Sequence, residues 1–260
     1  PTPPPPTPRR LQLKTAGELR TALVVWCQPP SSWGFLPSSV TVLLEDIADW
    51  DVSEVSDMTG LLSPDARKNH WPAADVFKTC NPDLGGWDVS HVTQMGSMFS
   101  KASAFNANLS LWNVGRVEEM GHMFAGASAF NSDVSRWDVS SVESMNTMFN
   151  GSSAFNQNLG NWDVSKVYSL QFMFQDCILF NHDLGRWNVK NANGVQYMFN
   201  GCTSFEQDLS KWQPGLNAGF KALSMAMFTP EDSKMCKNDG FWPKNLYLKN
   251  DPCSFSNAPW

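Results

Sequence analysis

The chain has 260 residues and a formal net charge of −6 that is spread along its length. Such a charge argues against a nucleic-acid-binding protein, which needs clustered Lys and Arg, and it specifies no cationic partner. No apolar run approaches the roughly 20 residues that a helix needs to cross a bilayer.

The first ten residues, 1–10, are predicted to be a Pro-rich linker. Residues 1–8 read Pro-Thr-Pro-Pro-Pro-Pro-Thr-Pro. This composition favours an extended polyproline II rod, which serves as a linker or stalk, or alternatively as a ligand for an aromatic groove. No signal peptide is visible, and because the chain starts at Pro1 rather than at methionine we expect an upstream segment to have been removed or left out.

Residues 11–42 are predicted to form an N-terminal cap built on one amphipathic helix. Thr15 and Glu18 have the spacing of a capping box. Leu19 and Leu23 follow at helical intervals, and Pro29 ends the helix. A capping element is expected here because the open end of a repeat array exposes apolar surface.

A 25-residue repeat dominates residues 43–214. Its clearest mark is a tryptophan in every unit, at Trp87, Trp112, Trp137, Trp162, Trp187 and Trp212. Trp50 precedes this series by one period plus 12 residues, which we assign to an insertion loop at about 60–79. A fixed period of this length is typical of a solenoid, in which each unit buries its apolar face against its neighbours.

Each unit is predicted to contain a strand and then a short helix. The stretch Phe105–Val114 suits a strand and a turn, and the stretch after it has helical apolar spacing. The apolar residues of that second stretch are Val117, Met120, Met123 and Phe124. The predicted fold class is therefore an α/β solenoid, a leucine-rich-repeat-like array of about six to seven strand–helix units. Because the repeat degrades after Trp212, a C-terminal cap that contains cysteines is expected over residues 215–260.

The repeated phrase is clearest at Phe155-Asn156-Gln157-Asn158-Leu159-Gly160-Asn161-Trp162-Asp163-Val164-Ser165, followed by Val167, Leu170, Met173 and Phe174. It resembles the phrase of the BspA-like leucine-rich-repeat surface proteins, first described as a mycoplasma domain of unknown function. The family also occurs in other bacteria, protists and algae. The resemblance covers about residues 11–228 and implies a solenoid on cell surfaces, used for adhesion or protein contacts and without catalytic residues.

The six cysteines are an even count, which is compatible with an oxidising compartment. Cys236 and Cys253 enclose a loop in the expected C-terminal cap, and a disulfide there, worth about 3 kcal/mol, is our first prediction. Cys80 occupies the Phe position of its unit, and a disulfide with Cys27 is the second. Two further cysteines occupy a small position in adjacent units, where core packing is favoured over a disulfide that the spacing also permits. They are Cys177 and Cys202.

Several columns of equivalent residues suggest ligands. The Trp column either fills the core, with Nε1–H donated to a backbone carbonyl, or forms a platform for carbohydrate, and core packing is favoured. A column of Asn, beginning at Asn81 and Asn106, is expected to bond backbone groups at turns. Columns of Asp and Asn suggest calcium, but the near alternation of the two residues in one column dilutes repulsion instead of collecting carboxylates, so calcium is disfavoured.

No catalytic residue, metal site or cofactor is expected. The four histidines share no column and have no zinc spacing with the cysteines. A Gly-rich phosphate loop and a nucleophile elbow are both missing from the sequence. Paired methionines such as Met120 and Met123 have the spacing of a core stripe rather than of a copper site.

Partner specificity is expected in the columns that vary between units. Five bulky apolar residues replace small or polar residues of other units, and we predict that they form a partner-binding patch or, alternatively, are covered by another part of the chain. They are Tyr168, Phe172, Ile178, Leu179 and Tyr197.

Two Asn-x-Ser sequons, at Asn108 and Asn150, would accept glycans in a secreted chain. Asn150 is preferred because Asn108 falls in a predicted strand.

The leading functional prediction is a non-enzymatic protein–protein interaction or adhesion module, exposed at a cell surface or part of a large extracellular assembly. A structural subunit of an organellar or intracellular complex is the second, with an organellar lumen as its location. A carbohydrate-binding array is the third, with a glycan in place of a protein partner.

Overall fold

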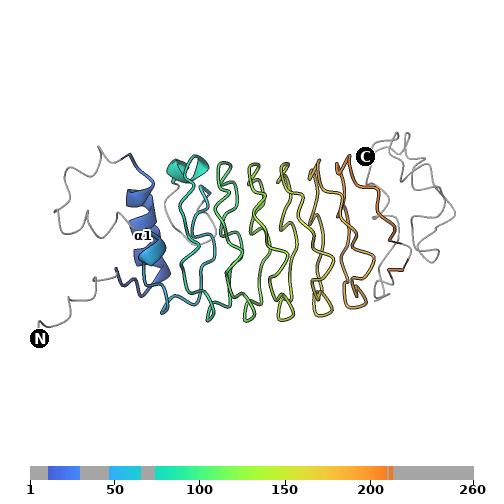
Figure 1. Cartoon of the computed structure of the whole chain (residues 1–260), viewed down its shortest axis with the longest axis horizontal. Coiled ribbons are helices and arrows are strands. Elements are labelled where there is room, and N and C mark those ends of the chain that lie inside the picture. Colours follow the sequence, from blue (N-terminus) through green and yellow to red (C-terminus); the bar gives the residue numbers. More distant parts are fainter. Residues whose placement is uncertain (1–10, 30–46, 66–73, 210, 213–260) are drawn as a thin grey trace, which may run out of the picture.

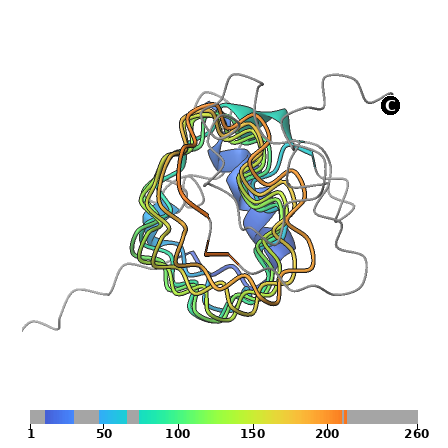
Figure 2. The same ribbon diagram turned by 90° about the vertical axis from the view of Figure 1, so that its right-hand side faces the viewer.

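The computed structural model describes residues 11–29, 47–65, 74–209 and 211–212. Successive repeat units form coils that stack along the longest axis of the molecule (Figure 1). Viewed along that axis, the coils superpose on one rounded outline (Figure 2). The predicted linker at 1–10 and the predicted C-terminal cap at 215–260, with Cys236 and Cys253, lie outside the described residues.

Equivalent aromatic side chains of neighbouring coils lie on top of one another. The ring centroids of Trp112 and Trp137 are 6.4 Å apart and their planes differ by 6°. Those of Phe105 and Phe130 are 6.2 Å apart, with planes 11° from parallel. A second column consists of Phe99, Phe124, Phe149, Phe174 and Phe199, with neighbouring centroids 5.3–5.7 Å apart. The core is therefore a set of aromatic columns that run through all the coils.

The Trp column is buried, and none of its side chains is more than 4 % exposed. Each indole Nε1–H from Trp87 onward donates to a backbone carbonyl of the preceding coil, as Trp112 does to Leu84 at 2.9 Å and Trp162 to Val134 at 3.1 Å. The prediction that these residues fill the core is confirmed. Burial also means that the indoles offer no face on which a sugar could stack.

The local structure of a unit differs from the predicted strand and helix. In the stretch Val117–Phe124, every second N–H group from Met120 onward donates to the next coil, as Met120 does to Ser144 at 3.0 Å. The N–H groups between them close turns, as Met123 does to Met120 at 3.1 Å, and the φ of His122 is +59°. Because each turn brings about every third side chain into the core, a succession of turns reproduces the helical spacing without forming a helix.

Regular secondary structure is correspondingly sparse among the described residues. The helices are α1 (Ala16–Trp26) and the short 3-10 helices η2 (Ile47–Asp49) and η4 (Asp75–Lys78). None of them is long and apolar enough to span a membrane. Neighbouring coils are joined by isolated parallel bridges, for example between Glu119 and Ser144.

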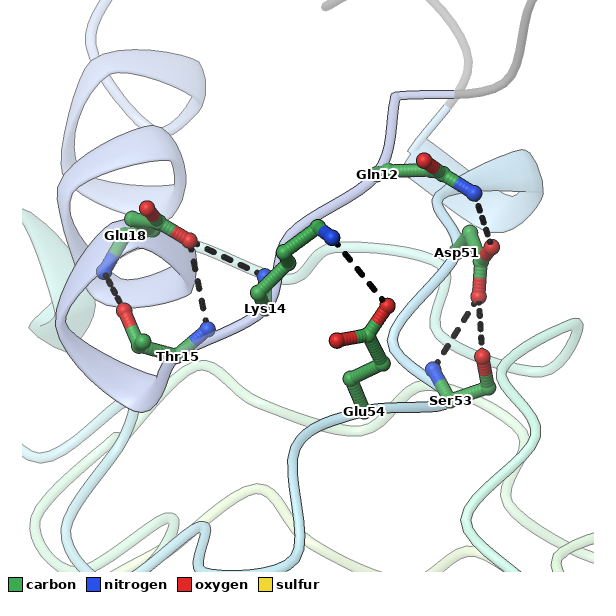
Figure 3. Close-up of polar contacts among 7 residues, drawn as sticks. All are labelled: Gln12, Lys14, Thr15, Glu18, Asp51, Ser53 and Glu54. Atoms are coloured by element: carbon green, nitrogen blue, oxygen red, sulfur yellow. Dashed lines mark hydrogen bonds and ion pairs between the residues drawn. The ribbon is translucent and has the colours of Figure 1, made fainter.

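The predicted capping box of α1 is present and confirms the start of this helix. Thr15 Oγ1 accepts from the backbone N–H of Glu18 at 3.2 Å, and Glu18 Oε2 accepts from the N–H of Thr15 at 3.2 Å (Figure 3). The residues before the helix pair with the first coil, where the N–H of Leu13 donates to the carbonyl of Asp51 at 3.0 Å. The helix lies at the N-terminal end of the stack (Figure 1).

Arg20 of α1 reaches from the cap into the first coil and is only 4 % exposed. Its guanidinium donates to the carbonyls of Gly60 at 3.0 Å, Leu61 at 2.7 Å and Ser63 at 3.0 Å, and lies 5.0 Å from the ring centroid of Phe77. Burial lowers the pKa of Arg20 to about 10, so the side chain remains charged at neutral pH. Arg20 thus takes the place of a preceding coil for the carbonyls of Leu61 and Ser63.

The insertion in the first unit is shorter than expected. Gly60 donates its N–H to Gly96 at 2.8 Å and Leu62 donates to Met98 at 2.8 Å, so residues 60–63 belong to the first coil. The carbonyl of Lys78 accepts from Ala104 at 3.0 Å, which returns the chain to the repeating pattern. The inserted segment therefore lies between Ser63 and Lys78 rather than filling residues 60–79.

We predict that Arg20→Met destabilises the first coil locally, by about 3 kcal/mol, because the buried carbonyls of Leu61 and Ser63 lose a charged donor. In hydrogen exchange, the amides of Met58, Gly60 and Leu62 should exchange about two orders of magnitude faster. The amides of Leu170 and Phe172 should keep their protection, because a coil contacts only its neighbours. The exposed Arg116→Met is the control, and equal protection in both variants would contradict the capping role.

Candidate interaction surface

One corner of every coil has backbone in the left-handed region. Its residues are Ser97, His122, Thr147, Phe172 and Tyr197, with φ between +54° and +60°. L-residues adopt this conformation at a cost of roughly 1–2 kcal/mol, and for bulky side chains it is unusual. Every coil repeats this conformation whatever residue is present, so the fold imposes it. Phe172 and Tyr197 therefore do not occupy this corner because of their own backbone preferences.

The predicted aromatic residues lie in two parallel columns along the stack. Phe172 and Tyr197 occupy the corner described above, where their rings stack with centroids 5.1 Å apart and planes 5° from parallel. Both side chains are half-buried. Tyr168 precedes Phe172 by four residues and is 49 % exposed. Tyr168 and Phe172 belong to one coil and Tyr197 to the next, and we call these three residues the aromatic surface.

The coils on the N-terminal side of this surface carry carboxylates. Tyr168 donates its N–H to the carbonyl of Glu143 at 2.9 Å, and Glu143 donates to Glu118 at 2.8 Å, so the three form one column. Both glutamates are exposed. Within the described part of the chain, neither carboxylate has an ion pair or a hydrogen bond.

We call the two columns together the four-coil face. One column consists of Glu118, Glu143, Tyr168 and Asn193, and the other of His122, Thr147, Phe172 and Tyr197. The sequence analysis found its aromatic half and missed its acidic half. The sequence could have indicated the acidic half, because Tyr168 replaces a glutamate that the two preceding units share.

Ile178 and Leu179 belong to a different corner of the coil. They follow the buried Cys177 and are 45 % and 52 % exposed. In the preceding coil, the hydroxyl of Ser153 at the place of Ile178 donates to the carbonyl of Ser128 at 3.4 Å, a bond that isoleucine cannot make. That this pair forms one patch with Tyr168, Phe172 and Tyr197 stays a prediction. Leu111, which is 83 % exposed, was not predicted.

The Asp and Asn columns close turns. The carboxylate of Asp88 accepts the N–H of Ser90 at 3.0 Å, and Asp133 and Asp163 accept from the serines two residues later at 2.9 and 3.0 Å. Hydrogen bonds from the serine hydroxyls make the largest contribution to lowering the pKa of all three carboxyls. The bonds from the serine backbone N–H groups make the second largest. The described ranges contain no cluster of three or more His, Cys, Asp or Glu side chains that could hold a metal ion.

The Asn column bonds the backbone between coils, as predicted. The N–H of Asn106 donates to Oδ1 of Asn81 at 2.8 Å, and Asn131 donates in the same way to Asn106 at 2.8 Å. Each side chain therefore serves the backbone of the coil that follows it, which confirms a structural role for this column.

The four cysteines within the described residues fall into two groups. Cys27 and Cys80 form a disulfide with 5.5 Å between their Cα atoms, which ties the end of α1 to the second coil. Closing a segment of 53 residues in this way stabilises by about 4 kcal/mol in the chain-entropy model. Cys177 and Cys202 are free and buried, and their thiols donate to the carbonyls of Phe149 and Phe174 at 2.9 and 2.7 Å. Burial raises the pKa of the Cys177 thiol well above its usual value, and the core prediction for this pair is confirmed.

The structure changes the order of preference between the two sequons. Asn108 was placed in a strand, but it is an exposed turn residue whose Oδ1 accepts the N–H of Ser110 at 3.0 Å. Asn150 is half-buried, and its Nδ2 donates to Gln175 Oε1 at 2.9 Å. A glycan on Asn150 would displace that hydrogen bond, so Asn108 is the more accessible acceptor.

One family model matches the chain over three overlapping segments, residues 38–133, 72–167 and 132–228. Its description is a mycoplasma protein of unknown function, DUF285. Neither the curated proteins nor the solved structures contain a match. Together the matched segments cover the described coils and extend to residue 228.

We predict that the turn aspartates make the fold sensitive to acid. A carboxyl whose pKa is lowered by folding contributes stability that is fully present above its unfolded pKa of about 3.9 and is lost as the pH falls through the folded value. The variant Asp88→Asn/Asp133→Asn/Asp163→Asn should therefore lose less stability than the native chain between pH 6 and pH 3, measured by urea unfolding. Asn113 and Asn188 occupy places equivalent to Asp88 and Asp163, and Asn108 and Asn158 occupy places equivalent to Asp133, so the variant should fold. Equal losses in both proteins would contradict this role.

Proposed function

We propose that this chain, which belongs to the DUF285 family of mycoplasma proteins of unknown function, is a non-enzymatic protein–protein interaction or adhesion module. The interaction surface would be carried on a leucine-rich-repeat-like solenoid of the BspA type. The observation that carries the proposal is the stacked pair Phe172–Tyr197 beside the exposed Tyr168. Aromatic residues of this kind are enriched in protein interfaces and contribute most of their binding energy.

Packing of the coils gives no reason for these aromatic residues. Ser97, His122 and Thr147 occupy the same corner in other coils, where the backbone makes equivalent bonds to the next coil. Phe172 and Tyr197 adopt a left-handed conformation that is unfavourable for large side chains, and both side chains are half-buried. Residues that reduce stability at a surface are best accounted for by a partner that covers them.

Several side chains capable of chemistry are already used by the fold, which supports a non-enzymatic module. Asp88, Asp133 and Asp163 close turns, and Cys177 donates to a backbone carbonyl. The polar columns therefore maintain the coil and leave recognition to the residues that vary between coils.

The disulfide between Cys27 and Cys80 supports a location at a cell surface or in an extracellular assembly. Disulfides persist in oxidising compartments and are rare in the reducing cytosol. An organellar lumen with oxidising conditions would satisfy the same chemistry. Detection of this bridge in a non-reducing digest of the native protein would support either location over the cytosol.

We predict that Tyr168→Asn/Phe172→Thr/Tyr197→Thr loses partner binding at least tenfold and keeps its stability, because Asn193 and Thr147 already occupy equivalent places. The measurement is quantitative affinity capture with the native chain and the variant, with urea unfolding of both. Leu111→Arg is the control, since it removes an exposed apolar residue before a different Trp and Arg136 has the same place in the next unit. Partners retained at native levels by the triple variant would contradict the proposal.

A further inference from the structure

We propose that the four-coil face binds an extended segment of a partner protein in which an aromatic or large aliphatic anchor lies two to four residues from Lys or Arg. This proposal rests on the proposed function and specifies the chemistry of the partner. The anchor would contact Tyr168, Phe172 and Tyr197, and the basic residue would lie against Glu118 and Glu143.

The face has two halves of different chemistry along the axis of the stack. Glu118 and Glu143 lie on one pair of coils, and Tyr168 continues their column on the next coil, through backbone hydrogen bonds of 2.8 and 2.9 Å. Phe172 and Tyr197 extend the apolar half by stacking across two coils, with centroids 5.1 Å apart. A ligand that matches both halves must therefore cross the coils rather than follow one of them.

The acidic half lacks a counter-charge in the part of the chain that the structure describes. The two glutamates are directly linked neighbours in adjacent coils, where like charges repel. Their side chains are exposed and have no basic partner there, so the repulsion is unrelieved. A Lys or Arg brought by a partner would relieve it, whereas an acidic segment or a nucleic-acid phosphate would add to it.

The distance between the acidic and aromatic halves of the face determines how many residues separate the basic residue from the anchor in the partner. Coils joined by backbone hydrogen bonds lie about 4.8 Å apart, so Tyr168 is about 10 Å from the coil of Glu118 and about 5 Å from that of Glu143. An extended chain advances about 3.3 Å per residue, and two to four residues therefore separate an anchor from a cation that reaches either glutamate. The basic residue lies on the side of the anchor that faces α1.

A displayed library of random 12-residue peptides, selected on the full chain, tests this inference. Counter-selection on Tyr168→Asn/Phe172→Thr/Tyr197→Thr keeps only the peptides that need the aromatic half. We expect the selected peptides to share an aromatic or aliphatic residue with Lys or Arg two to four positions away. A synthetic peptide of that sequence should bind at least tenfold more weakly to Glu118→Gln/Glu143→Gln, and its affinity for the native chain should fall as salt is raised.

The matched control is Asp138→Asn/Asp163→Asn, which removes two negative charges from the turn column after Trp and leaves amide oxygens to accept the same turn bonds. This variant should bind the peptide as the native chain does. Selected peptides without basic residues, or equal binding by both double variants, would overturn the charge requirement and leave the interaction function standing. If no peptide depends on the aromatic half, the linear-segment partner is overturned, and the capture experiment with the triple variant decides separately whether the face binds a folded protein.

Discussion

Contact between equivalent residues of successive coils is the constraint on which the structure depends. Alternate backbone N–H groups donate to the next coil, and each Trp from Trp87 onward donates its indole N–H to the preceding one. The same distance that satisfies these bonds brings the Phe and Trp rings into columns. A residue at one of these positions is therefore determined by its neighbours in two coils, which explains why the core columns hardly vary while the outward columns do.

This constraint separates what the sequence could predict from what it could not. The buried Trp column and the capping box at Thr15 and Glu18 follow from local rules and strict periodicity, and both were predicted. The helix expected at Val117–Phe124 was not found, because apolar residues three apart are compatible with either a helix or a series of turns. Only the destination of the backbone hydrogen bonds distinguishes the two, and the pattern of side chains does not encode it.

The candidate site, too, could be predicted only in part from the sequence. Substitution at a periodic position indicated Tyr168, Phe172 and Tyr197, because the repeat supplies its own internal comparison. The position of Ile178 and Leu179 in a later turn depends on how the coil turns after Phe172, which the sequence did not reveal. Phe172 and Tyr197 lie at a corner with positive φ, where the scaffold imposes the backbone and the side chain is free to change without altering the next coil. A rigid scaffold with replaceable corner residues is a suitable basis for recognition.

The cap at the N-terminal end has a consequence for how such a gene can change in length. Arg20 is matched to the carbonyls of Gly60, Leu61 and Ser63, and Cys27 is covalently tied to Cys80. The two leading units are therefore committed to α1 and cannot be exchanged with others. Interior units from Phe105 onward make only generic bonds to those before and after them, so recombination could duplicate or delete them whole. Such events would bring new corner residues together while the N-terminal end of the array stays fixed, and diversity of recognition would accumulate beyond the two leading units.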